Sequence, residues 1–414
     1  MQMNNQLMNR WMRNLEFGVS VIWLLYFMGV KLPSLFTTLL NALSYPIIAI
    51  LVILRWKRLP YVATRDIPLL LFIGTALASV LWSGDQNMTL KGIGGLLRML
   101  MFGAYFATRY SIEEQMKILA WVFGIAAILS LVVALAIPSY GIDKEGWTGI
   151  FPYKNFLGYT MSLAAILFLL TAFKERSQNW FAWIGFGLAI SLIILAHSSG
   201  SLVNILLLLS LIPLYQLVKQ HYKLRVIFLG IVCVLVGGTA LFILGNLETI
   251  LVDILGKSLE LNGRTPIWTL AIEKGMERPF LGYGYNAFWS SDAGIYIMIN
   301  TWSGLRETGF NSHNSYLELF LNLGFIGLFL YAISLVIVLI KALILLRSTQ
   351  EIQFIWQIQL LIFISIASMA DTNFIMSAGS SYCCIYISTS LSIAIEFERM
   401  RRKRNFQKLY AHSG

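Results

Sequence analysis

The chain has 414 residues, of which 57% are hydrophobic and only 12% are charged. So few charged side chains cannot cover a water-soluble globule of this length, which excludes a soluble globular protein. The formal net charge of +11 is spread over short loops without an aromatic-lined basic groove, which argues against a nucleic-acid partner. The lipid bilayer is therefore the expected surrounding of most of the chain.

Apolar runs recur along the whole chain, each near the roughly 20 residues that a helix needs to cross the hydrocarbon layer. They predict an all-α integral membrane protein of about twelve transmembrane helices, with one large outer, periplasmic loop that contains short helices. In chain order the predicted spans are Leu15–Val30, Ser34–Leu54, Ile67–Leu81, Leu90–Thr108, Ile118–Ile137, Phe156–Ala172, Trp180–Ala196, Leu202–Val218, Val226–Leu244, His313–Ile340, Phe354–Met369 and Ser377–Ile395.

The distribution of basic residues predicts the orientation of these helices. Most Lys and Arg residues fall in alternate loops, and cytoplasmic loops collect such residues, so both termini are expected in the cytoplasm. The long loop Gly245–Ser312 then lies on the outer face, where we expect the chemistry. The predicted organisation is membrane helices one to nine in 1–244, the outer loop in 245–312, helices ten to twelve in 313–395 and a basic cytoplasmic tail in 396–414.

The long loop carries several local signals. The segment NGRTPIW at 262–268 predicts a turn and then a helix to about Glu277, with Thr265 as its N-cap and Pro266 at the first helical position. The later pair Gly282 and Gly284 permits tight turns, or alternatively a close backbone contact to a ligand. Ser312 is the predicted N-cap of the tenth membrane helix, which would place His313 in the first turn of that helix.

Four segments in combination resemble the signature region of the bacterial O-antigen ligase and O-antigen polymerase superfamily. They are Gly263–Thr265 with Trp268, Glu277–Gly284, His313–Leu317 and Leu323–Gly327, with weaker matches at Gly149–Phe151 and Lys154–Gly158. The resemblance implies a GT-C-like glycosyltransferase in the bacterial inner membrane that acts on the outer face. It also implies an undecaprenyl-pyrophosphate-linked glycan as donor and inversion at the sugar by direct attack.

One departure bears on the subgroup within this superfamily. Ligase-like members usually carry a Ser-Arg pair near the seventh and eighth spans, whereas this chain has AHSSGS at 196–201. This Ser- and Gly-rich version is more similar to the exopolysaccharide polymerases, so we predict a polymerase that extends an acceptor glycan. Transfer to a lipid A core by a ligase, as in lipopolysaccharide biosynthesis, is the alternative. A membrane transporter or a lipid-linked oligosaccharide flippase is more distant, and a chain-length regulator protein stays open as a partner.

Glycan transfer from a pyrophosphate carrier requires a base for the acceptor hydroxyl and cations for the departing pyrophosphate. His313 is the predicted base, because imidazole titrates near neutral pH. Arginine offers planar paired donors to phosphate oxygens. The predicted pyrophosphate and glycan ligands are Arg264, Arg278, Arg306, Lys154 and Asn314. We find no metal-ligand cluster and no cofactor motif, so neither a metal nor a cofactor is predicted.

Ordinary structural explanations exist for the same residues. His313 would then only form hydrogen bonds at a helix start, and Arg264 and Arg278 would pair with Glu273 and Glu277. Arg306 and Lys154 would be a solvated and an interfacial charge.

Three further polar residues stand out near the predicted membrane boundary or within it. Arg98, midway along the fourth span, should face the bundle interior, where it could pair with Glu318. Glu318 and Arg98 are predicted supporting residues of the site. His197 is interpreted as a polar residue at a helix end rather than a second base.

Overall fold

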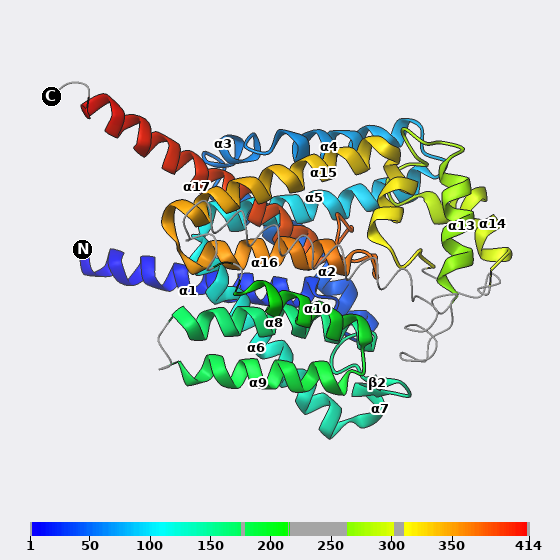
Figure 1. The fold of residues 1–414 in the computed structure, drawn as a ribbon, viewed down its shortest axis with the longest axis horizontal. Helices are drawn as coiled ribbons and strands as arrows, with labels where there is room; N and C mark the ends of the chain where they lie inside the picture. The colour runs from blue at the N-terminus through cyan, green and yellow to red at the C-terminus, as the bar shows by residue number, and fades with distance from the viewer. Residues whose placement is uncertain (1, 175–178, 214, 216–262, 302–309, 412–414) are drawn as a thin grey trace.

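A computed structural model describes all residues except 1, 175–178, 214, 216–262, 302–309 and 412–414. The described part is almost entirely helical and folds as a bundle of long, roughly aligned helices (Figure 1). In chain order the elements are α1 Gln2–Phe27, α2 Ser34–Ile53, α3 Leu59–Ala63, α4 Ile67–Ala78, η1 Ser79–Leu81, α5 Gln86–Arg109, α6 Ile112–Ala136, α7 Pro138–Gly141, β1 Ile142–Asp143, β2 Gly146–Trp147, α8 Lys154–Lys174, α9 Trp180–Leu195, α10 Ser199–Leu211, α13 Arg264–Gly275, η3 Phe288–Ser290, α14 Asp292–Ile299, α15 Ser315–Thr349, α16 Ile352–Ala367 and α17 Ser381–Ala411.

Four of the described helices are long and apolar enough to cross a membrane, namely α2, α6, α8 and α15. Shorter apolar helices lie at Ile67–Leu81, Trp180–Leu195, Ser199–Leu211 and Ile352–Ala367. The outward faces of α2 and α6 expose large apolar side chains such as Leu35, Leu39, Val132 and Leu135, which a water-soluble monomer would bury. The protein is therefore an all-α membrane protein.

The predicted spans within the described residues coincide with helices, while Val226–Leu244 and the end of Leu202–Val218 lie outside the described residues. The number of twelve crossings and the orientation of the bundle stay predictions.

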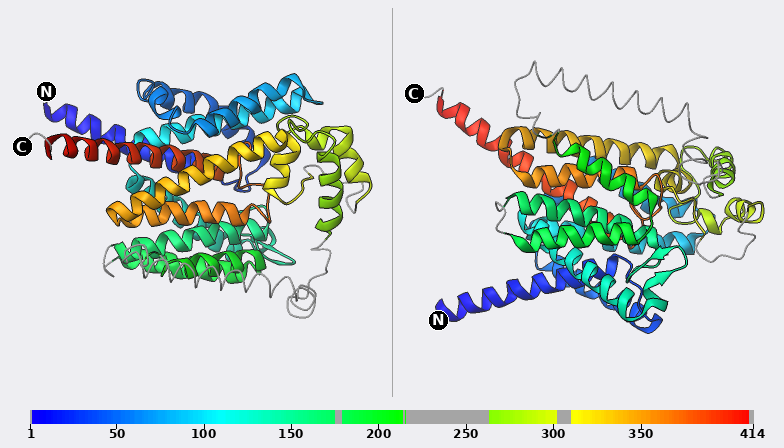
Figure 2. Two further views of the ribbon diagram at one scale, coloured as in Figure 1. Left: turned by 45° about the horizontal axis from the view of Figure 1, so that its top comes forward. Right: turned by 60° about the horizontal axis from the view of Figure 1, so that its bottom comes forward.

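Helix α8 forms the centre of one half of the bundle. Most of its side chains from Phe156 to Ala172 are buried, as in a helix that is apolar on all sides and surrounded by others. It packs against α9, α10, α16 and α6. In the other half, α5 packs against α17 and α15 packs against α4. Helix α16 contacts both α8 and α15 and so joins the two halves, and Figure 2 shows the bundle in two further views.

Local sequence determines where several helices begin. The Asp66 carboxylate accepts the Leu69 amide at 3.0 Å and starts α4, and Ser111 with Glu114 forms a capping box at the start of α6. Asp66 also accepts hydrogen bonds from Ser334 and Ser390, so one buried carboxylate joins α4 to α15 and α17. A cap and an interhelical contact thus depend on the same side chain.

The two ends of the bundle differ. The chain termini lie at one end, which we call the terminal end (Figure 1). At the other end α13 and α14 lie across the bundle, and we call this the loop end. The strands β1 and β2 form a short antiparallel hairpin near the loop end, and Gly146 in this hairpin lies against the carbonyl of Ala196 after α9. The loop end therefore gathers segments from distant parts of the sequence.

Candidate active site

The segment around His313 lies at the loop end, immediately before α15. The predicted cap at Ser312 is wrong, because Asn314 caps this helix: its Oδ1 accepts the amides of Tyr316 at 3.0 Å and Leu317 at 3.1 Å. His313 is therefore not in the first helical turn but precedes the helix. Its φ of 51° lies in the left-handed region, which is uncommon for a residue other than glycine. The His313 amide donates to Asn311 Oδ1 at 2.9 Å.

Ser312 ties this segment to two other parts of the loop end. Its amide donates to the Glu318 carboxylate at 2.7 Å, and its carbonyl accepts the indole N–H of Trp268 in α13 at 2.7 Å. Glu318 also accepts the indole N–H of Trp289 at 2.9 and 3.0 Å. The backbone next to His313 is thus held by fixed side chains on both sides. Glu318 contacts the segment that it was predicted to support.

The turn that follows α16 holds the start of α15, two residues after His313. The amide of Ser315 donates to the carbonyl of Ser368 at 2.8 Å, and its hydroxyl donates to the carbonyl of Asp371 at 2.6 Å. Arg264, at the start of α13, donates to the carbonyl of Ala370 at 3.1 Å. One short turn therefore joins the start of α15 to the start of α13.

Lys154 and Arg264 line one cavity of about 350 Å³ at the loop end, which we call the Lys154–Arg264 cavity. Their positions in the sequence are far apart, and the fold brings them together through α8 and α13. Lys154 forms an ion pair with Glu145 of the β1–β2 hairpin at 2.8 Å. The other lining residues are Glu145, Asn155, Tyr159, His197, Ser199, Gly200, Trp268, Met369 and Ala370. Two cations and the Trp268 that holds Ser312 thus share one cavity.

A second cavity, of about 470 Å³, lies on the other side of the His313 segment. Glu318, Trp289, Asn311 and Ser315 are among its lining residues, so we call it the Glu318 cavity. His313 is not among the described residues that line either cavity. Its segment lies between them, because Ser312 is hydrogen-bonded to Trp268 of one cavity and to Glu318 of the other.

Asp371 is a buried carboxylate that was not among the predicted site residues. It is only 4% exposed and accepts hydrogen bonds from the Tyr153 hydroxyl at 2.8 Å and from the backbone and side chain of Asn373. Burial, followed by the Asp371 charge, raises the pKa of Tyr153, so the phenol stays protonated and donates to Asp371. Only its place after an apolar run could have drawn attention to Asp371.

The segment RPFLGYG at 278–284 runs alongside a break in α15. The break is at Gly324, whose φ of 63° and ψ of −163° are not helical. The amides after the break donate to this segment: Phe325 to Pro279 at 2.7 Å and Ile326 to Phe280 at 3.3 Å. The backbone polar groups that the break frees are therefore satisfied.

The two glycines of the RPFLGYG segment allow its backbone to turn and to pack closely on neighbouring segments. Gly282 has a φ of 65° and lies against the backbone of Asn322, and Gly284 has a φ of 103° and lies against Ser83. The amide of Gly284 donates to the carbonyl of Asn322 at 3.0 Å. Both glycines serve tight turns and close packing, the first of the two predicted explanations.

The start of α13 differs slightly from the prediction. The helix begins at Arg264 and not at Pro266, and its N-cap is Gly263 in the left-handed conformation rather than Thr265. It ends at Gly275, where a Cβ would lie 2.3 Å from the ring of Phe320, so the close packing of α13 on α15 requires glycine. The predicted helix is present, with both ends shifted by two residues toward the N-terminus.

The remaining predicted residues lie apart from the Lys154–Arg264 cavity or outside the described residues. Arg278 is exposed and its guanidinium lies over the Tyr283 ring at 4.8 Å, while Glu277 pairs with Lys274 instead. Arg98 is buried as expected, but its pairing with Glu318 is wrong: Arg98 donates to Asn41 and, at 2.9 Å, to Ser44 of α2. Arg306 lies outside the described residues.

The AHSSGS segment at 196–201 forms the turn between α9 and α10. A Cβ on Gly200 would lie 2.3 Å from the Tyr159 hydroxyl, and Ser201 lies directly against Gly158 of α8. His197 has a φ of 49° and lines the Lys154–Arg264 cavity. From the sequence we interpreted His197 as a polar residue at a helix end, and that interpretation did not predict its position in this cavity.

Comparisons with known proteins give matches that include the segments at the loop end. A family model described as O-antigen ligase matches residues 184–332, which include α13, the RPFLGYG segment and His313. The exopolysaccharide production protein ExoQ of Rhizobium meliloti (strain 1021) is 27% identical over 275 residues, which are 63% of this chain. The match covers 61% of the length of that relative. These matches confirm the resemblance to the O-antigen ligase and polymerase superfamily that the sequence shows, and they place it mainly in residues 184–332.

Proposed function

We propose that this protein is a polysaccharide polymerase that transfers a glycan from an undecaprenyl pyrophosphate carrier to an acceptor glycan. The observation that carries the proposal is the Lys154–Arg264 cavity, where two cations from distant segments meet beside Trp268. Trp268 in turn holds the carbonyl of Ser312, one residue from His313. The pyrophosphate and the base act on the same sugar in glycan transfer, so the cations and His313 have to lie close to each other.

In the proposed step, the imidazole of His313 takes the proton of an acceptor hydroxyl. The hydroxyl oxygen forms a bond to the anomeric carbon of the donor sugar, and the bond from that carbon to the phosphate oxygen breaks. The electron pair leaves with the pyrophosphate, and direct attack inverts the configuration of the sugar. Arg264 and Lys154 stabilise the negative charge that develops on the leaving group.

Lys154 has an ion-pair partner that a pyrophosphate would replace. Glu145 is 72% exposed at its side chain and lies on the short hairpin, so breaking this pair costs little. Arg264 donates to the Ala370 carbonyl through Nη1. Within the part of the chain that the structure describes, its other nitrogens form no hydrogen bond, so they can donate to phosphate oxygens. The cavity can thus change from an ion pair to an anion site without moving a helix.

Two observations favour a polymerase over a ligase. The relative from Rhizobium meliloti is named for exopolysaccharide production. The turn before α10 also has the Ser- and Gly-rich sequence AHSSGS at 196–201, where ligase-like members usually carry a Ser-Arg pair.

The proposed reaction takes place at the outer face of the bacterial inner membrane. Basic loops and both termini gather at the terminal end, so we expect this end in the cytoplasm. The loop end with the candidate site would then face outward.

Reconstitution tests the proposal directly. Purified protein in proteoliposomes would receive the carrier-linked repeat unit of its host strain, with lipid A core added to a parallel sample. A ladder of longer carrier-linked glycans in both samples supports the polymerase. Product on lipid A core alone would identify a ligase, and no new linkage in either sample would favour a transporter or a flippase.

A further inference from the structure

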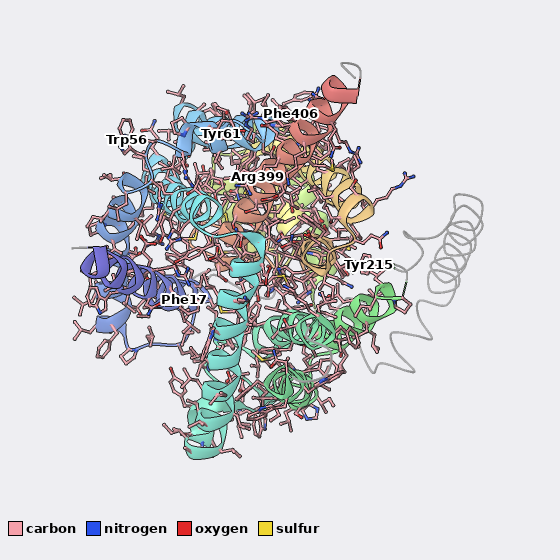
Figure 3. All side chains as sticks on the ribbon, turned by 90° about the vertical axis from the view of Figure 1, so that its left-hand side faces the viewer. Phe17, Trp56, Tyr61, Tyr215, Arg399 and Phe406 are labelled. Carbon is pink, nitrogen blue, oxygen red and sulfur yellow. The ribbon has the colours of Figure 1, made fainter. Side chains whose placement is uncertain are left out.

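A third cavity, of about 580 Å³, lies at the terminal end of the bundle, far from the candidate active site. The turn before α3, the end of α5, the start of α6 and the middle of α17 form its wall. Figure 3 views this end and labels Tyr61 and Arg399, two of the lining residues. We call it the terminal cavity.

The terminal cavity is strongly basic. Five of its lining residues carry a positive charge, namely Lys57, Arg58, Arg109, Arg399 and Arg402. Glu396 is the one carboxylate among the described lining residues. An anion entering this cavity would therefore meet an excess of positive charge.

Three of the five cations already have carboxylate partners. Arg399 pairs with Glu396 at 2.5 Å, Arg402 lies 3.9 Å from Glu398, and Arg109 pairs with Glu16. Lys57 and Arg58 have no ion pair within the part of the chain that the structure describes, and both are exposed. These two residues are the cations of the cavity without a carboxylate partner among the described residues.

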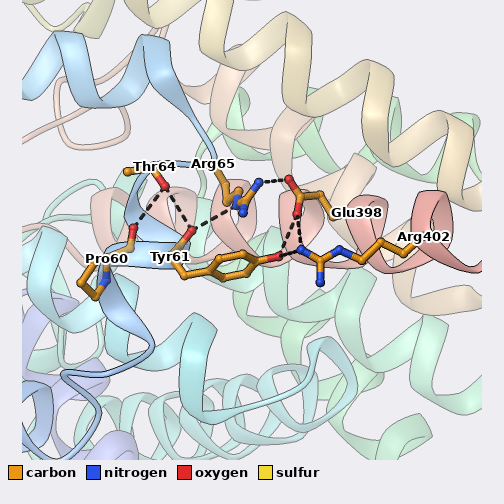
Figure 4. A network of polar contacts seen from close by, with 6 residues as sticks. All are labelled: Pro60, Tyr61, Thr64, Arg65, Glu398 and Arg402. Atoms are coloured by element: carbon orange, nitrogen blue, oxygen red, sulfur yellow. Dashed lines mark hydrogen bonds and ion pairs between the residues drawn. The ribbon is translucent and has the colours of Figure 1, made fainter.

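A polar network fixes the wall of the terminal cavity between α3 and α17 (Figure 4). The Tyr61 hydroxyl donates to Glu398 at 2.8 Å and accepts from Arg402 at 3.1 Å. Arg65 donates to the carboxylate of Glu398 and to the carbonyl of Tyr61. Glu398 is thus occupied by Arg65, Tyr61 and Arg402, so it does not cancel the charge of Lys57 and Arg58.

Part of the remaining wall of the terminal cavity is apolar. Val62, Ala107, Ile112 and Ile395 line it, next to the hydroxyl-bearing residues Tyr61, Thr108, Tyr110, Ser111 and Ser392. A ligand that satisfies both kinds of wall has an anionic group joined to a hydrocarbon part. A basic pocket between helix ends at the edge of the apolar bundle is the setting in which anionic lipid head groups bind.

The aromatic residues nearby fit a position at the membrane surface. Trp56, which directly precedes the lining residue Lys57, is 63% exposed, and Tyr61, which lines the cavity, is 41% exposed. Exposed Trp and Tyr side chains gather where the hydrocarbon layer meets the head groups. The basic helix end from Arg399 to Arg404 continues from the cavity wall away from the bundle (Figure 1).

We propose that the terminal cavity binds the phosphate of an anionic phospholipid, with Lys57 and Arg58 as its main ligands. The acyl chains of the lipid lie along the apolar wall. The site is independent of glycan transfer, since it lies at the opposite end of the bundle.

Native mass spectrometry of the purified full chain tests this site. The protein in neutral detergent is titrated with phosphatidylglycerol and, separately, with phosphatidylcholine. The double variant Lys57→Gln/Arg58→Gln should bind phosphatidylglycerol about tenfold more weakly than the unmodified chain, because each basic residue near an anionic lipid contributes a severalfold increase in affinity. The control Arg401→Gln/Lys403→Gln removes the same charge from exposed positions of α17 that do not line the cavity, and should leave binding unchanged.

Two results would overturn the proposal. Equal weakening by both double variants would mean that net charge alone attracts the lipid. Displacement of the lipid by millimolar inorganic phosphate, or a phosphate adduct without lipid, would assign the cavity to a free anion. If the first double variant fails to fold, a photoreactive phosphatidylglycerol on the unmodified chain decides: peptides from 57–62 or 392–402 should be labelled, and labelling elsewhere alone contradicts the site.

Discussion

The amide of Phe325 donates a 2.7 Å hydrogen bond to the carbonyl of Pro279, across the break that Gly324 makes in α15. This contact joins two segments that carry the family resemblance, RPFLGYG at 278–284 and Leu323–Gly327. The segments form one structural unit that holds the first turns of α15, and with them His313, at a fixed angle to the bundle. Much of the resemblance therefore describes a support for the site rather than the reacting groups.

Replacement of Gly324 by alanine should destabilise this unit. A Cβ at Gly324 would lie 2.3 Å from the carbonyl carbon and oxygen of Phe280, and the backbone conformation is one that only glycine adopts readily. We expect a loss of about 2–4 kcal/mol, seen as a lower melting temperature and reduced yield of monodisperse protein. The control Gly187→Ala in α9, where the Cβ meets nothing within 4 Å, should not reduce stability. Equal stability of the two variants would contradict the described break.

Replacement of Arg264 by glutamine should reduce glycan transfer much more than the same change at Arg278. Arg264 lines the Lys154–Arg264 cavity, whereas Arg278 is exposed and lies over Tyr283. We expect about a hundredfold loss in initial rate for Arg264→Gln, as when one donor to a developing negative charge is removed. The Arg278→Gln variant should lose less than about tenfold. The reverse order of the two losses would place the pyrophosphate outside the cavity.

The indole N–H of Trp268 should matter for activity through the His313 segment. Trp268→Phe keeps the aromatic packing and removes the 2.7 Å hydrogen bond to the Ser312 carbonyl. We expect a stability loss of about 1 kcal/mol and a lower turnover number with an unchanged Michaelis constant, because the base is less well positioned. Trp180→Phe, at an exposed position of α9, is the matched control. A higher Michaelis constant at unchanged turnover would instead make Trp268 a substrate ligand.

Asn314 has two functions that one substitution separates. Its Oδ1 caps α15. As a predicted ligand of the glycan donor, Asn314 would use its amide nitrogen, which is a hydrogen-bond donor. Asn314→Asp keeps the cap acceptor and removes the donor, so melting should be unchanged and glycan transfer should fall. Asn314→Ala should lose about 1 kcal/mol of stability as well. Full activity of the aspartate variant would limit Asn314 to a cap.

The length and spacing of apolar runs predict most of the helical elements, because a membrane helix has to satisfy its backbone within one continuous segment. Helix starts are less predictable. Ser312 and Asn314 are both good caps by residue type, and the choice depends on Glu318, which accepts the Ser312 amide. Likewise, the N-cap of α13 is Gly263 and not Thr265. Gly263 has a left-handed backbone conformation, and the helix begins at the next residue, Arg264.

The candidate site was predictable only in its parts. From the sequence we expected Arg264, Lys154 and His313 near the outer face, but which residues surround each of them depends on contacts between distant segments. His197 joins the Lys154–Arg264 cavity because the turn after α9 packs on α8, and no local pattern indicates that. Arg98 was expected inside the bundle, but its helix face, which local sequence does not reveal, directs it to Asn41 and Ser44.

The proposed base gives the most direct test of the proposed polymerase. Glycan length would be measured in a strain whose chromosomal copy carries His313→Ala, with membrane insertion confirmed and carrier-linked and released glycans analysed on separate gels. His197→Ala, which changes the other histidine among the described residues, serves as the comparison. We expect single repeat units on the carrier for His313→Ala and longer chains for His197→Ala. An unchanged length distribution in the His313 variant would contradict the assignment of His313 as the base.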